Sequence, residues 1–219
     1  MTVEHDASIE ILSALDVLRV SPVIPVVVID RVEDAVPLAR ALYAGGIGII
    51  EMTLRSEAAL GAIAAIAANV PEVVIGAGTV LTREDALRSM DAGSRFLVSP
   101  GSPSGLLDAA RALPVPLLAG VSTATEAMTL AEGGSTEMKF FPAESSGGAS
   151  ALGALAGPLP HLTFCPTGGI TPQNAVDYLA LPNVVCVGGS WLTPRSLVRA
   201  GEWAAIEELA RSASALATA

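Results

Sequence analysis

Lys139 is the residue whose type and position most strongly indicate chemistry. It is the only lysine of the chain, all other basic residues being arginine, and it lies inside the apolar run "EMKFFP". Burial disfavours a charged amine and lowers the pKa of a lysine from its ordinary value of about 10.4. Only the neutral amine can attack a carbonyl and form a Schiff base. A lysine with its stem on a strand and its charge in solvent is the alternative, and a compositional bias toward arginine also explains its rarity. Because arginine cannot form an imine, the position favours a catalytic lysine.

Two charged residues that end or follow the second apolar run could assist such an amine. Glu51 ends "GIGII", and Arg55 lies four residues later. A carboxylate could carry protons to and from a bound carbonyl, directly or through one water. A guanidinium could hold a substrate carboxylate with two hydrogen bonds. An ion pair of Glu51 with Arg55 or Lys139, and a solvated Arg55 on the first helical turn, remain open as structural alternatives.

Two glycine pairs end the last two apolar runs and predict an anion site. The stretches are Thr167-Gly168-Gly169 and Gly188-Gly189-Ser190. Glycine lets backbone N–H groups converge on an anion, and a helix that follows adds its dipole. Glycine also suits any tight turn between a strand and a helix. The occurrence of two such pairs after the seventh and eighth runs favours phosphate binding, since these loops form the common phosphate site of (β/α)8 barrels.

These candidates must be positioned by a regular series of short apolar runs separated by Ala-rich amphipathic segments. Eight runs begin at Val23, Ile47, Val73, Phe96, Pro116, Glu137, Leu162 and Val184. Strands alternating with helices at this spacing predict an α/β fold, a single (β/α)8 TIM barrel preceded by an N-terminal helix from about Ala7 to Leu18. Active-site groups of such barrels lie at the carboxyl ends of the strands. Strands 2 and 6 face each other there, so Glu51 and Lys139 would meet if both side chains point inward.

Local signals support helices between the runs. Three helix starts carry an N-cap residue in a favourable context: Thr82 with Asp85, Thr123 with Glu126, and Thr171 before Pro172. An open doubly wound sheet is the competing fold. Its dinucleotide fingerprint is not met, because "GAGTVL" at 76–81 has leucine where the third glycine should be. The barrel is therefore the favoured architecture.

Composition and charge narrow the class of protein. A formal net charge of −10 argues against nucleic acid and anionic membranes as partners. No apolar run is long enough to span a bilayer, and the acidic start lacks the layout of a signal peptide, so we expect a soluble, cytoplasmic protein. Cys165 and Cys186 lie in apolar runs and are expected to be buried free thiols. No cluster has metal-ligand spacing, and no linker divides the chain, so we expect one domain over 1–219 and no metal.

Taken together, these motifs resemble the class I 2-keto-3-deoxy-6-phosphogluconate (KDPG) aldolases, also called 4-hydroxy-2-oxoglutarate aldolases. The resemblance runs nearly end to end and rests on "PVIPV", "AGGIGIIEMTLRS", "IGAGTVL", "SPG", "GVSTATE", "KFFPAE", "FCPTGGITPQN" and "VGGSWL". The second strand departs from the family in having "EMT" where "EVT" is commoner. This departure touches no residue that the family pattern makes catalytic.

The resemblance implies a role for each candidate. Lys139 would form the imine with pyruvate and Glu51 would be the acid and base. The remaining implied contacts are Arg55 and Thr79 to the pyruvyl carboxylate region, Pro100 and Phe141 as walls of the pocket, Thr167 to the sugar hydroxyls, and Gly168, Gly169, Gly189 and Ser190 to the phosphate. The family is typically a homotrimer and needs neither a metal nor another cofactor.

The implied activity is cleavage of a small phosphorylated 2-keto sugar acid, KDPG, to pyruvate and glyceraldehyde 3-phosphate, with possible activity on 4-hydroxy-2-oxoglutarate. Three alternatives stay open. The galactonate-configured sister aldolase differs at C4, although the threonine of "PTGG" favours the gluconate type. A phosphate-binding barrel isomerase or synthase would use the same glycines without needing Lys139. A non-catalytic phosphosugar-binding protein would have the pocket without turnover.

Overall fold

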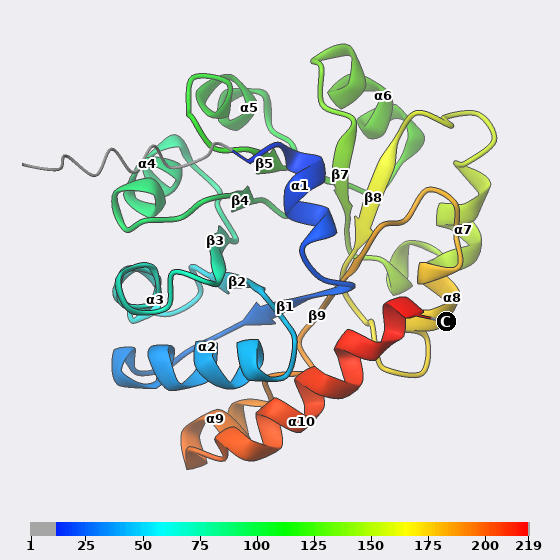
Figure 1. Cartoon of the computed structure of the whole chain (residues 1–219). Coiled ribbons are helices and arrows are strands. Elements are labelled where there is room, and N and C mark those ends of the chain that lie inside the picture. The colour runs from blue at the N-terminus through cyan, green and yellow to red at the C-terminus, as the bar shows by residue number, and fades with distance from the viewer. Residues whose placement is uncertain (1–11, 219) are drawn as a thin grey trace, which may run out of the picture.

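The computed structural model describes residues 12–218 and consists of parallel strands with helices around them (Figure 1). Every one of the eight apolar runs contains a strand, which confirms the predicted alternation. The strands are β1 (Val23–Val27), β2 (Ile49–Thr53), β3 (Val74–Gly78), β4 (Leu97–Val98), β5 (Leu117–Leu118), β6 (Gly120–Val121), β7 (Glu137–Phe140), β8 (Thr163–Pro166) and β9 (Val187–Gly189). The fifth run holds two short strands, β5 and β6, which only Ala119 separates.

The strands form a curled parallel sheet that hydrogen bonding divides into two parts. Six strands are ordered β5-β4-β3-β2-β1-β9, and three are ordered β6-β7-β8. Every strand pairing in the two parts is parallel, as consecutive strand–helix units require. The isolated bridge between Thr167 and Gly188 lies between the β8 end of one part and the β9 end of the other. The α/β class with a curled parallel sheet is thus confirmed.

Alternation along the strands divides the buried residues between two faces of the sheet. In β2, Ile50 and Met52 pack in the outer cluster, between sheet and helices, whereas Ile49 belongs to a separate inner cluster. Successive side chains of a strand point to opposite faces, so Glu51 shares the inner face with Ile49. In β7, Met138 and Phe140 lie in the outer cluster, which places Lys139 on the inner face. The sheet pattern therefore turns both candidate residues inward.

The inner cluster fills the space inside the curled sheet, on the side where the strands begin. Its members come from the first helix and from inward-facing strand positions: Val17, Leu18, Ile24, Ile49, Phe96, Val98, Leu118, Cys165 and Cys186. Figure 1 shows α1 (Ala14–Arg19) lying across the strands, and it buries Val17 and Leu18 completely. An apolar plug at this end leaves the polar side chains to the carboxyl ends of the strands.

The helices lie between the strands as predicted, with one correction at the first helix. Their bounds are α2 (Ala35–Ala44), α3 (Ala59–Asn69), α4 (Arg83–Asp91), α5 (Ser104–Ala110), α6 (Ala124–Glu132), α7 (Gly148–Ala154), α8 (Ala175–Leu179), α9 (Arg195–Ala200) and α10 (Trp203–Ser214), with 3₁₀ turns η1 (Val32–Asp34), η2 (Glu144–Ser146) and η3 (Ala215–Thr218). The capping boxes that begin α4 and α6 are confirmed.

The correction concerns the leading helix: Leu12 and Ser13, which were predicted to be helical, precede the helix, and α1 begins at Ala14. A capping box between Ser13 and Asp16 fixes this start, and the predicted positions 7–11 lie outside the described residues.

Thr171 makes the predicted N-cap bonds before α8, whose bounds begin at Ala175. Its Oγ1 accepts from the Asn174 N–H over 3.3 Å, and its own N–H donates to Asn174 Oδ1 over 2.7 Å. Its carbonyl accepts from the Ala175 N–H over 3.0 Å.

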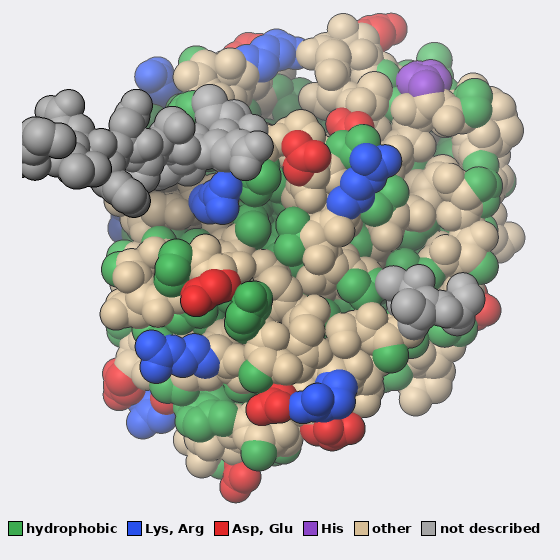
Figure 2. Space-filling model, viewed as in Figure 1, with side chains coloured by type: hydrophobic (Ala, Val, Ile, Leu, Met, Phe, Trp, Pro, Cys, Tyr) green, Lys and Arg blue, Asp and Glu red, His purple; other side chains and the backbone are tan. Residues whose placement is uncertain are grey.

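Charged side chains are spread over the surface. On the face shown in Figure 2, acidic and basic residues are interspersed, so neither sign forms a continuous patch there. None of the helices within residues 12–218 combines the length and the apolar character needed to cross a bilayer.

Candidate active site

Lys139 and Glu51 meet on the inner face although 88 residues separate them. The Lys139 Nζ donates a hydrogen bond to Glu51 Oε1 over 3.3 Å. Both side chains are buried, with 7% and 4% of their surface exposed. Strands β7 and β2 do not pair with each other, so the contact crosses the space enclosed by the curled sheet. The structure thus brings an amine and a carboxylate together in a nearly dry setting.

Gly78 makes the room that the Glu51 carboxylate occupies. A Cβ atom on Gly78 would lie 2.1 Å from Glu51 Oε1 and 2.6 Å from its Cγ, distances that no real side chain tolerates. Gly78 ends β3 and pairs with Thr53 of β2, so the carboxylate lies against the neighbouring strand. The sequence analysis missed this residue. The glycine alternation in "IGAG" was the signal, since glycine inside a strand often marks a close approach.

Thr79 and Pro100 follow the two strands beyond β2. Thr79 has a φ of 60°, the left-handed region that a β-branched residue rarely adopts, and such outliers cluster at functional sites. The Pro100 carbonyl lies against Gly120, where a Cβ would be 2.3 Å from its oxygen. Because Gly120 pairs with Lys139, Pro100 lies two strands away from the lysine at the same level. Thr79 therefore follows the glycine that lies against Glu51, and Pro100 lies against the strand that pairs with Lys139.

A cavity of about 160 Å³ adjoins this pair and collects most other predicted site residues. It is lined by Val26, Arg55, Phe141, Thr167, Gly168, Gly169, Ile170, Gly188, Gly189 and Ser190. The Phe141 ring centroid lies 5.1 Å from Lys139 Nζ, which places the amine next to the cavity wall. Val26 and Ile170 were not predicted, because apolar lining residues carry no distinguishing signal in a hydrophobic sequence.

Arg55 is the one charged side chain among the cavity's lining residues. Its Nε donates to Thr53 Oγ1 over 3.2 Å, and that hydroxyl donates to the Val27 carbonyl over 2.7 Å. This relay fixes the guanidinium from the strand below it. Glu51 pairs with Lys139 and, within residues 12–218, makes no ion pair with Arg55, which instead lines the cavity.

Two other arginines near the carboxyl ends of the strands have an acidic partner. Asp30, which follows β1, accepts hydrogen bonds from Arg199 Nε over 2.7 Å and from Arg195. The Arg199 and then the Arg195 hydrogen bonds lower the pKa of Asp30 below its ordinary value. The single carboxylate offsets only one of these two positive charges, and neither arginine is among the residues that line the cavity.

Thr167 contacts one of the two cysteines of the inner cluster. Cys165 Sγ lies 3.9 Å from Thr167 Oγ1. Both thiols are free and buried, as predicted. A hydrogen bond with Cys165, together with burial, raises the pKa of the Cys186 thiol well above its ordinary value. Cys186 is therefore an inert packing residue at neutral pH.

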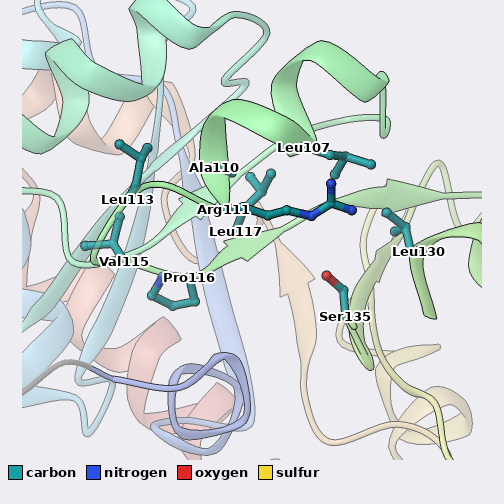
Figure 3. Close-up of a pocket in the computed structure, with 9 residues that line it drawn as sticks. All are labelled: Leu107, Ala110, Arg111, Leu113, Val115, Pro116, Leu117, Leu130 and Ser135. Carbon is teal, nitrogen blue, oxygen red and sulfur yellow. The ribbon is translucent and has the colours of Figure 1, made fainter. Parts of the chain in front are cut away.

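A second cavity lies apart from all these residues. It has a volume of about 210 Å³ and is lined by Leu107, Ala110, Arg111, Leu113, Val115, Pro116, Leu117, Leu130 and Ser135. Figure 3 shows the Arg111 side chain extending across it. No predicted site residue is in this lining, and the Arg111 guanidinium already binds Asp108 Oδ1 at 2.7 Å. Although it is the larger cavity, it lacks the groups that chemistry needs.

No metal centre accompanies the site in the part of the chain that the structure describes. Within residues 12–218, His, Cys, Asp and Glu side chains nowhere gather in groups of three or more that could hold an ion. The chemistry available at the site is that of an amine, a carboxylate and a cavity suited to an anion.

Comparison with known proteins agrees with this geometry. The family model for KDPG and KHG aldolases matches residues 15–209. The chain belongs to this aldolase family. A 2-dehydro-3-deoxy-phosphogluconate aldolase of Pseudoalteromonas atlantica is 52% identical over 203 residues, 93% of this chain and 94% of that protein. The KHG/KDPG aldolase of Escherichia coli K12 is 50% identical over 201 residues, 92% and 94% of the two chains.

A solved structure of the same family is also similar. The KDPG aldolase of Legionella pneumophila, captured with pyruvate as a covalent carbinolamine intermediate, superimposes with a TM-score of 0.91. It is 44% identical, and the match covers 93% of this chain and 98% of that one. The predicted membership in the KDPG and KHG aldolase family is therefore confirmed.

Proposed function

We propose that this protein is a class I aldolase that cleaves KDPG to pyruvate and D-glyceraldehyde 3-phosphate. The observation that carries the proposal is the buried contact of 3.3 Å between Lys139 Nζ and Glu51 Oε1 beside the glycine-lined cavity. An isomerase or synthase that needed only a phosphate pocket would have no use for a buried amine in this place. The names of the curated relatives support the same activity.

The first half of the reaction attaches the substrate to the enzyme. Lys139 must lose a proton before it can attack, and Glu51 Oε1 is positioned to accept that proton through the existing hydrogen bond. The amine then adds to the C2 carbonyl and forms a carbinolamine. Proton donation from Glu51 to the departing hydroxyl releases water and leaves an iminium ion.

The second half breaks the carbon–carbon bond. Glu51, directly or through one water, removes the proton of the C4 hydroxyl. The C3–C4 bond breaks, its electron pair enters the iminium to form an enamine, and C4 leaves as the aldehyde of glyceraldehyde 3-phosphate. Protonation of the enamine at C3 gives the pyruvate iminium, and water hydrolyses it to pyruvate and the free amine.

The remaining residues are proposed to hold the two ends of the substrate. Arg55 and Thr79 bind the carboxylate end, and Thr167 binds the sugar hydroxyls. Pro100 and Phe141 form apolar walls that keep the amine dry. The phosphate end is bound by the backbone N–H groups of Gly168, Gly169 and Gly189 and by Ser190. This role is supported by the fact that these four residues line one cavity.

The galactonate-configured sister activity is the second candidate, and activity on 4-hydroxy-2-oxoglutarate is a third. Thr167 lines the cavity with its hydroxyl near Gly188, which supports a polar contact to a sugar hydroxyl and thus the gluconate configuration. The shared amine and carboxylate would also serve the unphosphorylated substrate. The relative rates on the two C4 epimers decide between the sister activities.

For the architecture, we propose a closed (β/α)8 barrel in a single domain over 1–219. Two observations support closure: β5 and β6 continue one another across Ala119, and the Thr167–Gly188 bridge joins the other two sheet ends. The homotrimer stays a prediction from the family resemblance, and the cytoplasmic location stays a prediction from the composition of the sequence. Analytical ultracentrifugation of the purified chain tests the trimer.

The proposed chemistry is tested by trapping the imine. Protein is incubated with pyruvate, reduced with borohydride, digested and mapped by mass spectrometry. We expect one reduced pyruvyl group per chain on Lys139. The N-terminal amine is the competing nucleophile, and digestion separates the two sites because they lie in different peptides. Unmodified Lys139 in folded protein would overturn the imine mechanism.

A further inference from the structure

Glu144 lies directly against the loop that we expect to bind phosphate. Its N–H donates to the Gly168 carbonyl over 3.1 Å. Its Cγ lies 2.6 Å from the point where a Cβ on Gly169 would be, so the stem of Glu144 covers the bare Cα of that glycine. The φ of Gly169 is +78°, which also excludes most side chains there. Glu144 therefore supports the turn both through its backbone and through its side chain.

The carboxylate of Glu144 is in turn held by Tyr178. Tyr178 belongs to α8, the helix after the glycine loop, and it is only 1% exposed. Its hydroxyl donates a short hydrogen bond to Glu144 Oε1. Burial, and then the Glu144 carboxylate, raise the pKa of Tyr178, so the hydroxyl stays protonated and remains a donor. The bond joins the segment after β7 to the helix after β8.

Because Glu144 is negatively charged, its hydrogen bond with Tyr178 can affect the preference for a phosphorylated substrate. A free carboxylate next to Gly168 and Gly169 would repel a phosphate dianion that approaches the same loop. The Glu144 side chain is otherwise exposed, and rotation about its Cβ–Cγ and Cγ–Cδ bonds could turn the carboxylate toward the N–H groups of the loop. The Tyr178 hydroxyl fixes it on the α8 side of the turn.

We propose that Tyr178 and Glu144 are positioning residues that set the preference for phosphorylated over unphosphorylated substrate. Tyr178 keeps the Glu144 carboxylate turned away from the anion, and the stem of Glu144 keeps the glycine turn in its binding shape. This inference rests on the proposed aldolase function and adds a specificity device to it.

The test is a double-mutant cycle read as kcat/KM on two substrates, KDPG and 4-hydroxy-2-oxoglutarate. Tyr178→Phe frees the carboxylate and should lower kcat/KM for KDPG about tenfold, the usual scale of a lost hydrogen bond to a charged group. The unphosphorylated substrate should lose much less. Glu144→Gln in the Tyr178→Phe background removes the charge and should restore KDPG to within about threefold of wild type.

Tyr43→Phe is the matched control. Tyr43 is the other tyrosine of the chain, and it lies on α2 with 48% of its surface exposed. The same oxygen is removed there without touching the loop, so both substrates should keep their wild-type rates. If Tyr178→Phe does not fold, Glu144→Asp tests the same bond, because its shorter side chain keeps the charge but cannot reach Tyr178. It should show the same selective loss.

Equal losses for both substrates in folded Tyr178→Phe would overturn the inference, as would a selective loss that Glu144→Gln fails to restore. The failure of the proposed function looks different. A wild-type enzyme that cleaves neither substrate, or that forms no imine on Lys139, would contradict the function itself before any variant is made. A wild-type enzyme that cleaves both substrates equally well would overturn only the inference about substrate preference.

Discussion

The two cavities of this protein differ in the origin of their lining. The cavity of about 160 Å³ is lined from residue 26 to residue 190, by ends of strands and the loops that follow them. The cavity of about 210 Å³ is lined only by residues 107 to 135, around α5 and α6. The first collects groups that are distant in sequence, and the second is a gap between neighbouring elements.

The difference between them is chemical as well as topological. The smaller cavity adjoins a buried amine and carboxylate and is bordered by four glycines and the guanidinium of Arg55. Most residues that line the larger one are aliphatic or proline, and its guanidinium is already paired with Asp108. Size alone would therefore select the wrong cavity, and the convergence of polar groups selects the right one.

Lys139→Arg should have the largest effect on the smaller cavity's proposed chemistry, because it keeps the charge but removes the amine. We expect kcat for KDPG to fall to background, a loss of at least ~10³-fold, because guanidinium cannot form the imine. Steady-state assays coupled to pyruvate release measure it, with circular dichroism to verify folding. Substantial activity left in the folded variant would make the position structural.

Glu51→Gln should have the next largest effect. The amide has nearly the same shape, so it fits against Gly78, but it cannot accept the lysine proton or carry protons during dehydration. Loss of a general acid and base predicts a fall in kcat of about 10²- to 10⁴-fold. A higher KM with an unchanged kcat would assign Glu51 to substrate binding and contradict the proposed role.

Gly78→Ala tests whether the place of the carboxylate matters. The new Cβ would lie 2.1 Å from Glu51 Oε1 and must displace it from Lys139. A misplacement of about 1 Å can cost roughly a hundredfold in rate, which is the loss expected in kcat. Gly105→Ala is the matched control, since a Cβ there meets nothing within 4 Å. Equal activity of the two variants would show that the carboxylate tolerates displacement.

Gly168→Val should act selectively on the phosphate end. Its φ of +100° suits glycine, and a Cβ would lie 3.3 Å from the Phe141 ring. We expect kcat/KM for KDPG to fall about ten- to hundredfold, with a smaller loss for 4-hydroxy-2-oxoglutarate and intact pyruvate trapping on Lys139. Gly134→Val, with a φ of +90° and open space around it, carries comparable strain away from the cavity. Equal losses on both substrates would show that Gly168 shapes the loop without binding phosphate.

Arg111→Met tests the other side of the comparison and should change least. Arg111 and Asp108 are exposed by 57% and 68%, and exposed ion pairs contribute little to stability. We expect kcat/KM within about twofold of wild type and a free energy of unfolding within about 0.5 kcal/mol. A large loss of activity would show that the second cavity communicates with the first.

Much of the fold and of the site could be predicted from the sequence. Each apolar run became a strand because short buried strands and the amphipathic segments between them carry local patterns, and the capping boxes of α4 and α6 fixed their helix starts. The capping bonds of Thr171 were also as predicted. The leading helix differs from the prediction at Leu12 and Ser13, because the capping box of Ser13 with Asp16 fixes the helix start at Ala14.

What the sequence alone determined was the kind of chemistry: a lone lysine in an apolar strand, a carboxylate at the end of another, and two glycine pairs after the last strands. The tertiary structure decided which of them meet. Only the curl of the sheet brings Glu51 within 3.3 Å of Lys139, puts the bare backbone of Gly78 beneath the carboxylate, and joins Glu144 to Tyr178. Such contacts between distant segments depend on strand register and on the inward or outward turn of each side chain. Local sequence constrains these features only weakly, because they are set by packing of the whole chain.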